Sequence, residues 1–447
     1  MPGEAELFEG LPEQAAAGEA PRGAARLRQP ERQQIAWHNA AIDDLVAPDH
    51  PVRAVWAFVS TLDLSALHDA VKAREGVPGH PPAAPEVMMA LWLWATVDGV
   101  GSARQVARLC EEHLAYRWLC GGVSMNYHGL SDFRVGHVAL LDRLLARGVA
   151  ALVAEGLVAL DVLAQDGMKV RASAGASSFR RRQRLEQLEA AATARVAQLR
   201  AELEADPSAG ERRKRAAQER AARERVERIA AAKARLEALE AERARREKTN
   251  KAQVAKQKEP RASTTDAEAR VMKMADGGFR PAYNMQLVTA SGYQVIVAVD
   301  VETTGSDRGL ARPALEGLAG QAIKPADYLV DGGFAKNQDI EWAHANHIAL
   351  WCPATQSKHG GDPYAPRDGD GAGVAQWRCR MASEHGKMFY RQRGQAECPN
   401  AWARRMSLSQ LLVRGKHKAR ATLLWFALAH NMVRTFTLRQ AAQGSPA

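Results

Sequence analysis

The sequence predicts an α/β protein in three parts: an all-helical N-terminal region, a mixed sheet with helices on its faces, and a helical hairpin inserted into the sheet region. Three observations lead to this prediction. Apolar residues recur at helical spacing over 33–156, short β-rich runs alternate with helical stretches over 157–440, and an Ala/Glu/Arg/Lys-rich tract at 179–258 interrupts the strands.

The two ends of the chain are predicted to be tails. Residues 1–32 are rich in Ala, Gly, Pro, Arg and Glu, a composition that buries too little surface to offset the entropy of ordering, so we expect disorder there. Residues 441–447 form a second, short tail. The N-terminal segment lacks the apolar core of a signal peptide, and no stretch approaches the ~18 consecutive apolar residues of a membrane span. We therefore expect a cytoplasmic protein without a membrane part.

The helical region is divided by Gly- and Pro-rich breaks. Val52, Val55 and Val59 illustrate its apolar periodicity. A turn at 99–101 is followed by Ser102, which is a good N-cap for a helix beginning at the next residue. Helix-turn-helix proteins place such a second helix in the DNA major groove, and a simple packed pair of helices fits the same pattern at least as well.

The tract at 179–258 predicts two antiparallel helices separated by a break at 206–210. One apolar stripe comprises Leu185, Leu188, Val196, Leu199 and Leu203, and the other comprises Val226, Ile229, Leu236 and Leu239. The tract holds 23 Lys and Arg against 13 Asp and Glu, which leaves two interpretations open. The hairpin either follows a DNA backbone or is a solvated element with i,i+4 charge pairs.

The sheet region begins with an apolar run at 157–166 that ends in Asp-Gly, which predicts a buried strand followed by a turn. Runs at 282–289 and 293–300, joined by a short Gly-containing link, predict a β-hairpin. The remaining predicted elements are helices at about 308–321 and 336–346, strands at 327–331 and 348–351, a loop at 355–386, and helices at about 395–413 and 416–440.

Charge and cysteine content narrow the functional classes. The chain has 61 Lys and Arg against 51 Asp and Glu, a formal net charge of +10, which favours a polyanionic partner such as nucleic acid. Its five cysteines are an odd number without a CxxC pair, so we expect reduced thiols instead of a disulfide framework or zinc ribbon.

Three carboxylates are candidates for chemistry on a phosphodiester, because such reactions commonly use Mg²⁺ held by oxygen ligands. Asp166 and Asp331 each end a predicted strand and precede a glycine, so both can point into one crevice at the sheet edge. An isolated Asp-Gly pair is more often a plain turn. Glu397 begins a predicted helix and is the third candidate. Asp300 ranks behind them, as a solvated strand end.

The spacing around Glu397 resembles a known signature. Tyr390, Arg393, Glu397 and Arg404 follow the pattern Tyr-x2-Arg-x3-Glu-x6-Lys/Arg, which is similar to the signature at the catalytic glutamate of bacterial insertion-sequence DDE transposases. The resemblance extends upstream through 49–53, 130–134 and the Asp166 segment. It implies a ribonuclease-H-like catalytic domain. Position 404 carries Arg where the signature most often has Lys. This keeps the positive charge but replaces the compact ammonium group of Lys by the planar guanidinium group of Arg.

The resemblance also implies roles for individual residues. The implied catalytic and metal-binding residues, for Mg²⁺ or Mn²⁺, are Asp166, Asp331 and Glu397. The implied DNA contacts are Tyr390, Arg393 and Arg404. The implied partners are double-stranded DNA at the element ends and target DNA, bound by a homo-oligomer associated with the nucleoid.

The predicted function is therefore a transposase that cuts and joins the ends of an insertion sequence by metal-dependent phosphoryl transfer. Two alternatives stay open. One is a catalytically inactive relative that only binds DNA, and the other is a metal-dependent nuclease that hydrolyses DNA without strand transfer. The presence of all three acids favours an active enzyme, and a joined product separates a transposase from a nuclease.

Overall fold

The computed structural model describes residues 41–74, 76, 81–205, 209–249, 251–255, 258–354, 361–406 and 408–444. The tail predicted at 1–32 lies outside the described residues, as do the last three residues of the tail predicted at 441–447. None of the helices in the described ranges is long and apolar enough to cross a membrane. The described chain from Ile42 onward forms one unit.

The N-terminal region is helical, as predicted. Its elements are η1 (Ile42–Leu45), α1 (Pro51–Val59), α2 (Ser65–Ala70), α3 (Pro85–Val97), α4 (Ala103–Glu112), α5 (Leu114–Cys120), α6 (Tyr127–Gly136) and α7 (Val138–Ala154). The predicted N-cap is confirmed, because the Ser102 hydroxyl accepts from the backbone N–H of Gln105 at 3.4 Å. Helix α3 is apolar over most of its surface and forms the centre of this region's core.

The sheet contains both antiparallel and parallel strands, which confirms the predicted mixed α/β class. Its strands are β1 (Val162–Arg171), β4 (Arg270–Lys273), β5 (Phe279–Ala290), β6 (Val295–Glu302), β7 (Asp327–Leu329) and β8 (Ala349–Trp351). The order across the sheet is β6-β5-β1-β7-β8, and β4 pairs with the beginning of β5. Strands β1, β5 and β6 are antiparallel neighbours, whereas β7 and β8 run parallel to β1. The predicted hairpin corresponds to β5 and β6.

Strand β1 corrects one prediction. The expected turn after Asp166 is wrong, because β1 continues to Arg171 and Gly167 pairs with Gln286. The physical reason is the length of β5, which supplies backbone hydrogen-bonding partners for β1 as far as Ala282. Asp166 therefore lies within a strand.

Helices cover the sheet, and two more predictions are corrected among them. The helices are α11 (Ala311–Ala319), α12 (Asn337–Ala345), α13 (Ala372–Ala382), α14 (Glu384–Tyr390), α15 (Glu397–Arg405) and α16 (Lys416–Gly444), with short turns η2 (Ala176–Ser178), η3 (Gly332–Phe334) and η4 (Arg391–Ala396). The loop predicted at 355–386 contains α13, because Val374, Trp377 and Met381 recur at helical spacing and are buried. The helix predicted to reach residue 413 ends at Arg405, and the chain then passes beside β1, where Gln410 bridges Arg171.

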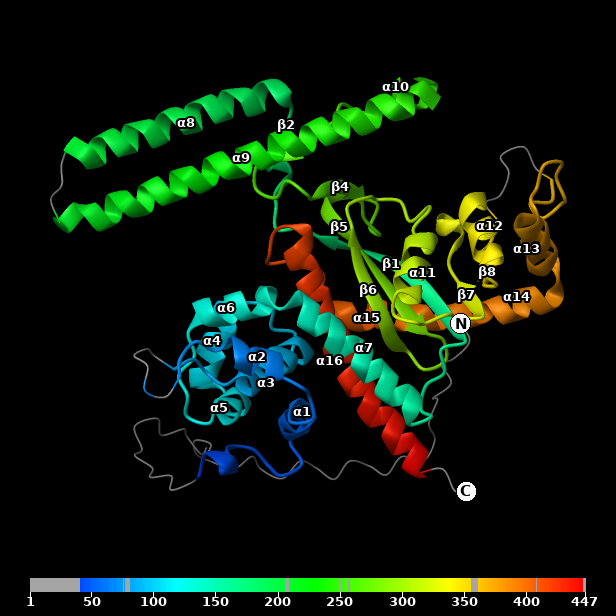
Figure 1. Cartoon of the computed structure of the whole chain (residues 1–447), viewed down its shortest axis with the longest axis horizontal. Helices are drawn as coiled ribbons and strands as arrows, with labels where there is room; N and C mark the ends of the chain where they lie inside the picture. Colours follow the sequence, from blue (N-terminus) through cyan, green and yellow to red (C-terminus); the bar gives the residue numbers. More distant parts are fainter. Residues whose placement is uncertain are drawn as a thin grey trace, which may run out of the picture. The chain divides into compact units, whose positions relative to one another are not determined.

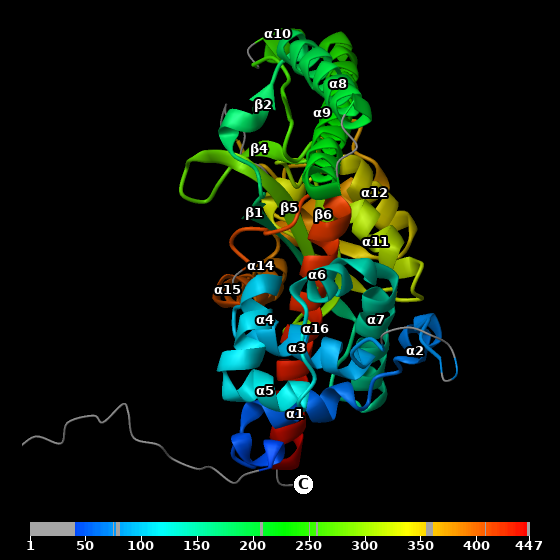
Figure 2. The same ribbon diagram turned by 90° about the vertical axis from the view of Figure 1, so that its left-hand side faces the viewer.

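Helix α16 joins the helical region to the sheet. It packs against α3, α6 and α7 on one side and against β5 and β6 on the other (Figures 1 and 2). Most side chains from Ala419 to Met432 are buried, so this part of the helix is covered on nearly all sides. The His430 Nε2 atom lies 2.7 Å from the Gln294 carbonyl oxygen, so this ring contacts the turn between β5 and β6.

The tract between β1 and β4 forms the two predicted antiparallel helices. They are α8 (Arg182–Ala205) and α9 (Ala209–Thr249), followed by α10 (Lys251–Ala255), and a short ribbon of β2 (Phe179–Arg180) and β3 (Ala262–Ser263) closes their base. The apolar stripes meet in a small core that includes Leu185, Ile229 and Leu236. We call α8 and α9 the helical hairpin (Figure 1).

Candidate active site

The sheet register brings Asp166 and Asp331 together. Strands β1 and β7 are parallel, and Ala164 pairs with Leu329. Asp166 lies two residues beyond Ala164 within β1, and Asp331 lies two residues beyond Leu329, so both acids occupy equivalent positions just past the last paired residues of β1 and β7. Adjacent strands are about 4.8 Å apart, which places the two carboxylates at one edge.

The segment that carries Asp331 is fixed by its own hydrogen bonds. The Asp331 carboxylate accepts from the Gly333 backbone N–H at 2.6 Å and caps η3. The Tyr390 hydroxyl donates to the Val330 carbonyl at 2.9 Å, which ties the start of η4 to the end of β7. A Cβ on Gly332 would lie 3.2 Å from the Pro353 carbonyl oxygen, so this turn packs closely against the chain after β8.

Arg393 lies among all three predicted acids. Its guanidinium donates to Asp166 Oδ1 at 2.8 Å and to Glu397 Oε1 at 3.0 Å, and lies 3.9 Å from Asp331 Oδ2. Glu397 follows Arg393 by one helical turn, which explains why their side chains meet. The four residues form what we call the acidic cluster: Asp166, Asp331, Arg393 and Glu397.

Burial within the acidic cluster is uneven. The side chains of Asp166 and Arg393 are 13% and 12% exposed, whereas those of Asp331 and Glu397 are 44% and 66% exposed. Burial raises the pKa of Asp166 to about 6; Arg393 opposes this shift, and Asp331 and Glu397 add to it. Burial alone would lower the pKa of Arg393, but the surrounding acids, Asp166 first, raise it. Asp166 is thus a desolvated carboxylate that depends on a nearby cation.

Asn400 belongs to the same site and was missed at the level of sequence. Its Nδ2 atom donates to Asp166 Oδ2 at 2.6 Å, and its buried Oδ1 atom has no hydrogen-bond partner within the described chain. Asn400 follows Glu397 by three residues on α15, so the two share a helix face. That spacing was the available signal.

The reverse side of β1 carries a second polar group. The Asp307 carboxylate accepts from Lys169 at 2.8 Å, Asn284 at 2.6 Å and Gln286 at 2.9 Å. A Cβ on Gly167 would come within 2.5 Å of Asp307 Oδ1. Glycine is required there because Asp307 and its partners pack directly over the strand that carries Asp166.

The remaining predicted residues lie at different depths. Tyr390 is half-buried and its hydroxyl is engaged by a backbone carbonyl. Arg404 is exposed on α15 and makes no ion pair with any described residue. It lies two helical turns, or about 10 Å, beyond Glu397. Asp300 is outside the acidic cluster: its side chain is exposed and lies 3.8 Å from Arg420.

The donor chemistry of the acidic cluster fits a hard divalent cation. Three carboxylates and the unpartnered amide oxygen of Asn400 are oxygen ligands of the kind that Mg²⁺ and Mn²⁺ take. Within the described residues, no three His, Cys, Asp or Glu side chains already converge as a metal cage. In this conformation the Arg393 guanidinium lies between the three acids.

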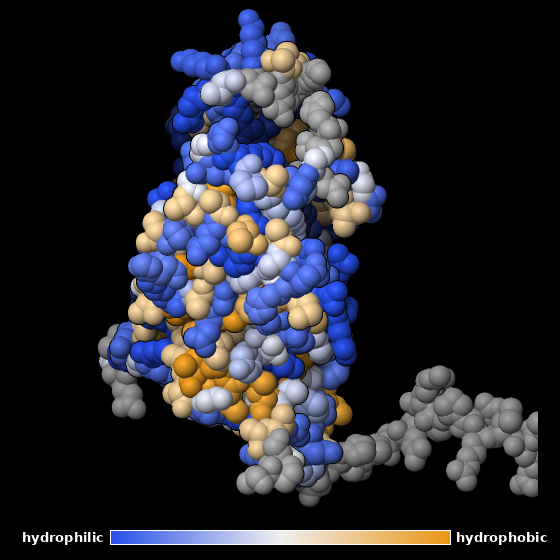
Figure 3. All heavy atoms as spheres, turned by 90° about the vertical axis from the view of Figure 1, so that its right-hand side faces the viewer, coloured by the Kyte–Doolittle hydropathy of each residue, from blue (hydrophilic) through white to orange (hydrophobic). Residues whose placement is uncertain are grey.

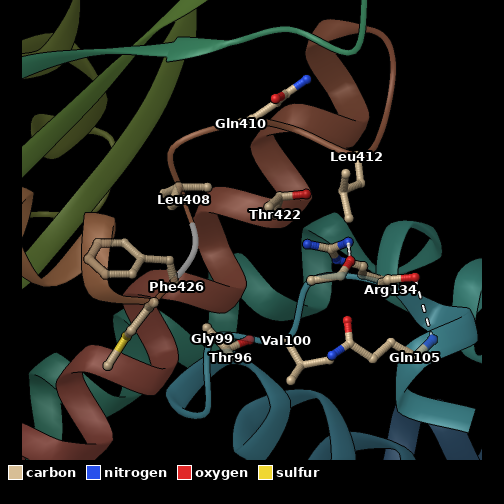
Figure 4. Close-up of a pocket in the computed structure, with 13 residues that line it drawn as sticks. Thr96, Gly99, Val100, Gln105, Arg134, Leu408, Gln410, Leu412, Thr422 and Phe426 are labelled. Carbon is tan, nitrogen blue, oxygen red and sulfur yellow. Dashed lines mark hydrogen bonds between the residues drawn. The ribbon is translucent and has the colours of Figure 1, made fainter. Parts of the chain in front are cut away.

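A separate cavity of about 250 Å³ lies between the helical region and the C-terminal segment. Figure 4 shows Arg134, Gln105 and Leu412 at one side of it and Phe426 at the other. Arg134 donates to the Gly101 carbonyl, lies 4.8 Å from the centre of the Trp92 ring, and has its pKa lowered to about 10 by burial. It therefore fixes the turn before α4.

Two transposase families match the chain. The family described as "Transposase domain (DUF772)" matches residues 40–135, and "Transposase DDE domain" matches residues 253–432. The second match contains Asp331 and Glu397, whereas Asp166 lies upstream of it. Comparison with curated proteins and with solved structures gave no match. Both descriptions name a transposase, and the two matches cover the helical region except α7 and the sheet except β1. The chain therefore belongs to the insertion-sequence DDE transposases.

Proposed function

We propose that the protein is a DNA transposase that cuts and joins the ends of its insertion sequence by metal-dependent phosphoryl transfer. The observation that supports this most directly is the acidic cluster, in which Asp166, Asp331 and Glu397 all lie within 4 Å of one guanidinium. The three acids come from β1, the end of β7 and the start of α15, so only the folded chain assembles them.

We further propose that residues 157–440 form a ribonuclease-H-like catalytic domain with the helical hairpin as an insertion. The strand order supports this assignment, because three antiparallel strands are followed by two strands parallel to the first. The helical hairpin leaves this sheet after β1 and returns before β4, so it can be inserted without disturbing the strand order.

Asp166, Asp331 and Glu397 are the proposed ligands of Mg²⁺ or Mn²⁺. The metal would supply charge neutralisation at the phosphate and would lower the pKa of the attacking hydroxyl. Asp166 is suited to this role because burial denies it water and makes a cation its most favourable neighbour. Asn400 orients Asp166 through its amide N–H and brings a free oxygen to the same site.

Arg393 and Tyr390 have distinct proposed roles. Arg393 is the counter-cation of the three acids, and its guanidinium would have to turn away from them if a metal ion occupied the same space. The Tyr390 hydroxyl holds the Asp331 segment through the Val330 carbonyl, so Tyr390 is a positioning residue and not a nucleophile. Arg404 is exposed on the same helix and is available to bind phosphate.

The proposed partners are double-stranded DNA at the element ends and target DNA, bound by a homo-oligomer in the cytoplasm. The basic composition of the chain supports a DNA partner.

The proposal is tested by incubating labelled duplexes that carry the flanking element ends with Mg²⁺ or Mn²⁺. Asp331→Asn is the test variant, because Asn keeps an acceptor for the Gly333 N–H but removes the charge. Asp300→Asn is the matched control, since it removes an exposed acid outside the acidic cluster. We expect nicking and strand transfer by the wild type and the control, and DNA binding alone by the test variant.

Other results redirect the assignment. Binding without cleavage by the wild type would indicate an inactive DNA-binding relative, and cleavage without joined product would indicate a nuclease. Full activity of Asp331→Asn would show that Asp331 is not a metal ligand.

A further inference from the structure

All of the chain's excess positive charge resides in the inserted tract. Residues 179–258 carry 23 Lys and Arg against 13 Asp and Glu, and the whole chain carries 61 against 51. The rest of the protein is therefore balanced, with 38 of each sign. A tract with this excess is a candidate for contact with a polyanion.

The acids of the helical hairpin are largely used inside it. Three ion pairs cross between the helices at 2.5 to 3.0 Å. Arg182 and Arg200 of α8 pair with Glu240 and Glu219 of α9, and Lys233 of α9 pairs with Glu189 of α8. These pairs hold α8 to α9. The side chains of several exposed bases make no ion pair or hydrogen bond with described residues, and these bases include Arg225, Arg245 and Lys248. The view in Figure 3 shows a mostly hydrophilic surface at its top, where the helical hairpin lies.

A cavity of about 370 Å³ lies where the helical hairpin joins the sheet region. Its polar lining consists of Arg225, Arg228, Thr264, Thr265 and Arg414, and no carboxylate belongs to its lining. We call these five residues the arginine cradle. They come from α9, from the segment after β3 and from the segment before α16, three parts of the chain that are far apart in sequence.

The arginine cradle has free hydrogen-bonding capacity. Arg225, Arg414 and the Thr265 hydroxyl make no hydrogen bond or ion pair with other described residues. Arg228 has one partner, the exposed Glu224 at 3.6 Å, and such an i,i+4 pair is weak. The Thr264 hydroxyl donates to Ser178 and can still accept. Planar guanidinium forks beside hydroxyl groups match the geometry of a phosphate.

Hydrogen bonds connect two of the three segments that carry the arginine cradle. The Ser263 hydroxyl accepts from the backbone N–H groups of Thr265 at 3.1 Å and Asp266 at 3.0 Å. The buried Asp266 carboxylate in turn accepts from the Gly415 N–H at 3.2 Å and the Tyr283 hydroxyl at 2.7 Å. These bonds tie the backbone beside Arg414 to the backbone of the two threonines without a ligand, and such preorganisation lowers the ordering cost of binding one.

We propose that the arginine cradle binds a backbone phosphate of duplex DNA and that the helical hairpin is a DNA-binding arm of the transposase. The proposal rests on the proposed function insofar as DNA is the substrate. It favours the DNA-contact interpretation of the basic tract, and it adds a phosphate site apart from Arg393 and Arg404.

The test variant is Arg225→Gln with Arg414→Gln, which removes two unpaired charges from the arginine cradle. The matched control is Arg312→Gln with Arg439→Gln, which removes two charges that form surface pairs outside the helical hairpin. Affinity for the element-end duplex is measured by fluorescence anisotropy in EDTA over a series of NaCl concentrations. Both full-length variants are first compared with the wild type by thermal unfolding.

We expect the test variant to bind the duplex about 10-fold more weakly than the wild type. The slope of log K against log salt should be smaller by about 1 to 2, because losing phosphate contacts lowers the number of counterions that binding releases. The control should stay within about 2-fold of the wild type. A test variant that matches the control would overturn the inference. The inference would also be overturned if the test variant kept the wild-type salt slope but lost self-association in sedimentation. The arginine cradle would then bind a second copy of the protein and not DNA. Failure of the wild type to bind DNA would instead refute the proposed function.

Discussion

Replacing Arg393 by Gln tests the idea that this side chain is the internal counter-cation of the metal ligands. Of its three acidic neighbours, only Asp166 is as buried as Arg393 itself, whereas Asp331 and Glu397 are substantially exposed. Losing one partner of a buried pair typically costs about 3 to 5 kcal/mol. The loss here should be smaller, because Asp166 can escape its uncompensated charge by taking a proton.

The magnitude follows from the pKa of Asp166, which burial raises to about 6. At pH 7.5, which is about 1.5 pH units above this pKa, protonating Asp166 costs about 2 kcal/mol, because each pH unit corresponds to about 1.4 kcal/mol. The free energy of unfolding of Arg393→Gln should therefore be about 2 kcal/mol lower than that of the wild type. The loss should shrink toward pH 5.5, where the proton costs little. If the guanidinium must leave before a cation enters, its removal should strengthen Mn²⁺ binding by the same 2 kcal/mol, or about 30-fold.

Urea unfolding in EDTA measures the stability, and calorimetric titration with Mn²⁺ measures the affinity. Arg404→Gln is the matched control, because it removes the same charge from an exposed position on α15. Unchanged stability of Arg393→Gln would show that the ion pairs contribute nothing. Weaker Mn²⁺ binding by Arg393→Gln would show that Arg393 helps to bind the metal and does not occupy its place. Either result would contradict the role of Arg393 as the internal counter-cation.

Three further predictions concern the same strand and its neighbours. Burial raises the pKa of Asp166 from 3.8 to about 6, so its stabilising contribution is fully present below about pH 4 and is lost as pH rises through 6. Between pH 4 and 7, the free energy of unfolding of Asp166→Asn should therefore rise by about 3 kcal/mol relative to that of the wild type, as measured by urea titrations with EDTA. Parallel pH profiles of the two proteins would contradict this. Gly167→Ala should lower stability by about 1 to 3 kcal/mol in thermal unfolding, because the added Cβ would overlap Asp307. The control Gly317→Ala should not lower stability, because the space around its Cβ is open. Equal effects of the two substitutions would argue against close packing of Asp307 over Gly167. Tyr390→Phe should lower stability by about 1 kcal/mol, because it removes the hydrogen bond to the Val330 carbonyl, and it should keep strand-transfer activity. Complete loss of the joined product would instead indicate that Tyr390 acts as a nucleophile.

The parts of the molecule that could be predicted are those encoded locally. Helical periodicity and an N-cap located α4, and two apolar stripes located α8 and α9, because each pattern lies within one element. The spacing of Arg393 and Glu397 is also local, since one helical turn brings their side chains together. Composition misled at α13, where polar and glycine residues surround a buried apolar stripe.

The errors at Asp166 and Asn400 have a common cause. Whether β1 stops at Asp166 depends on the length of β5, a strand more than a hundred residues away. Whether Asn400 contacts Asp166 depends on how α15 packs over the sheet edge. Neither fact has a signature in the neighbouring residues.

The mixed α/β class, the helical N-terminal region and the three candidate acids could be predicted from local patterns, because periodicity, turn residues and spacing act over a few residues. The position of Arg393 between Asp166, Asp331 and Glu397 could not be predicted in this way, and neither could the single cavity that Arg225 and Arg414 line. The physical reason is that through-space contacts follow from strand register and helix packing, which combine segments that no local pattern relates.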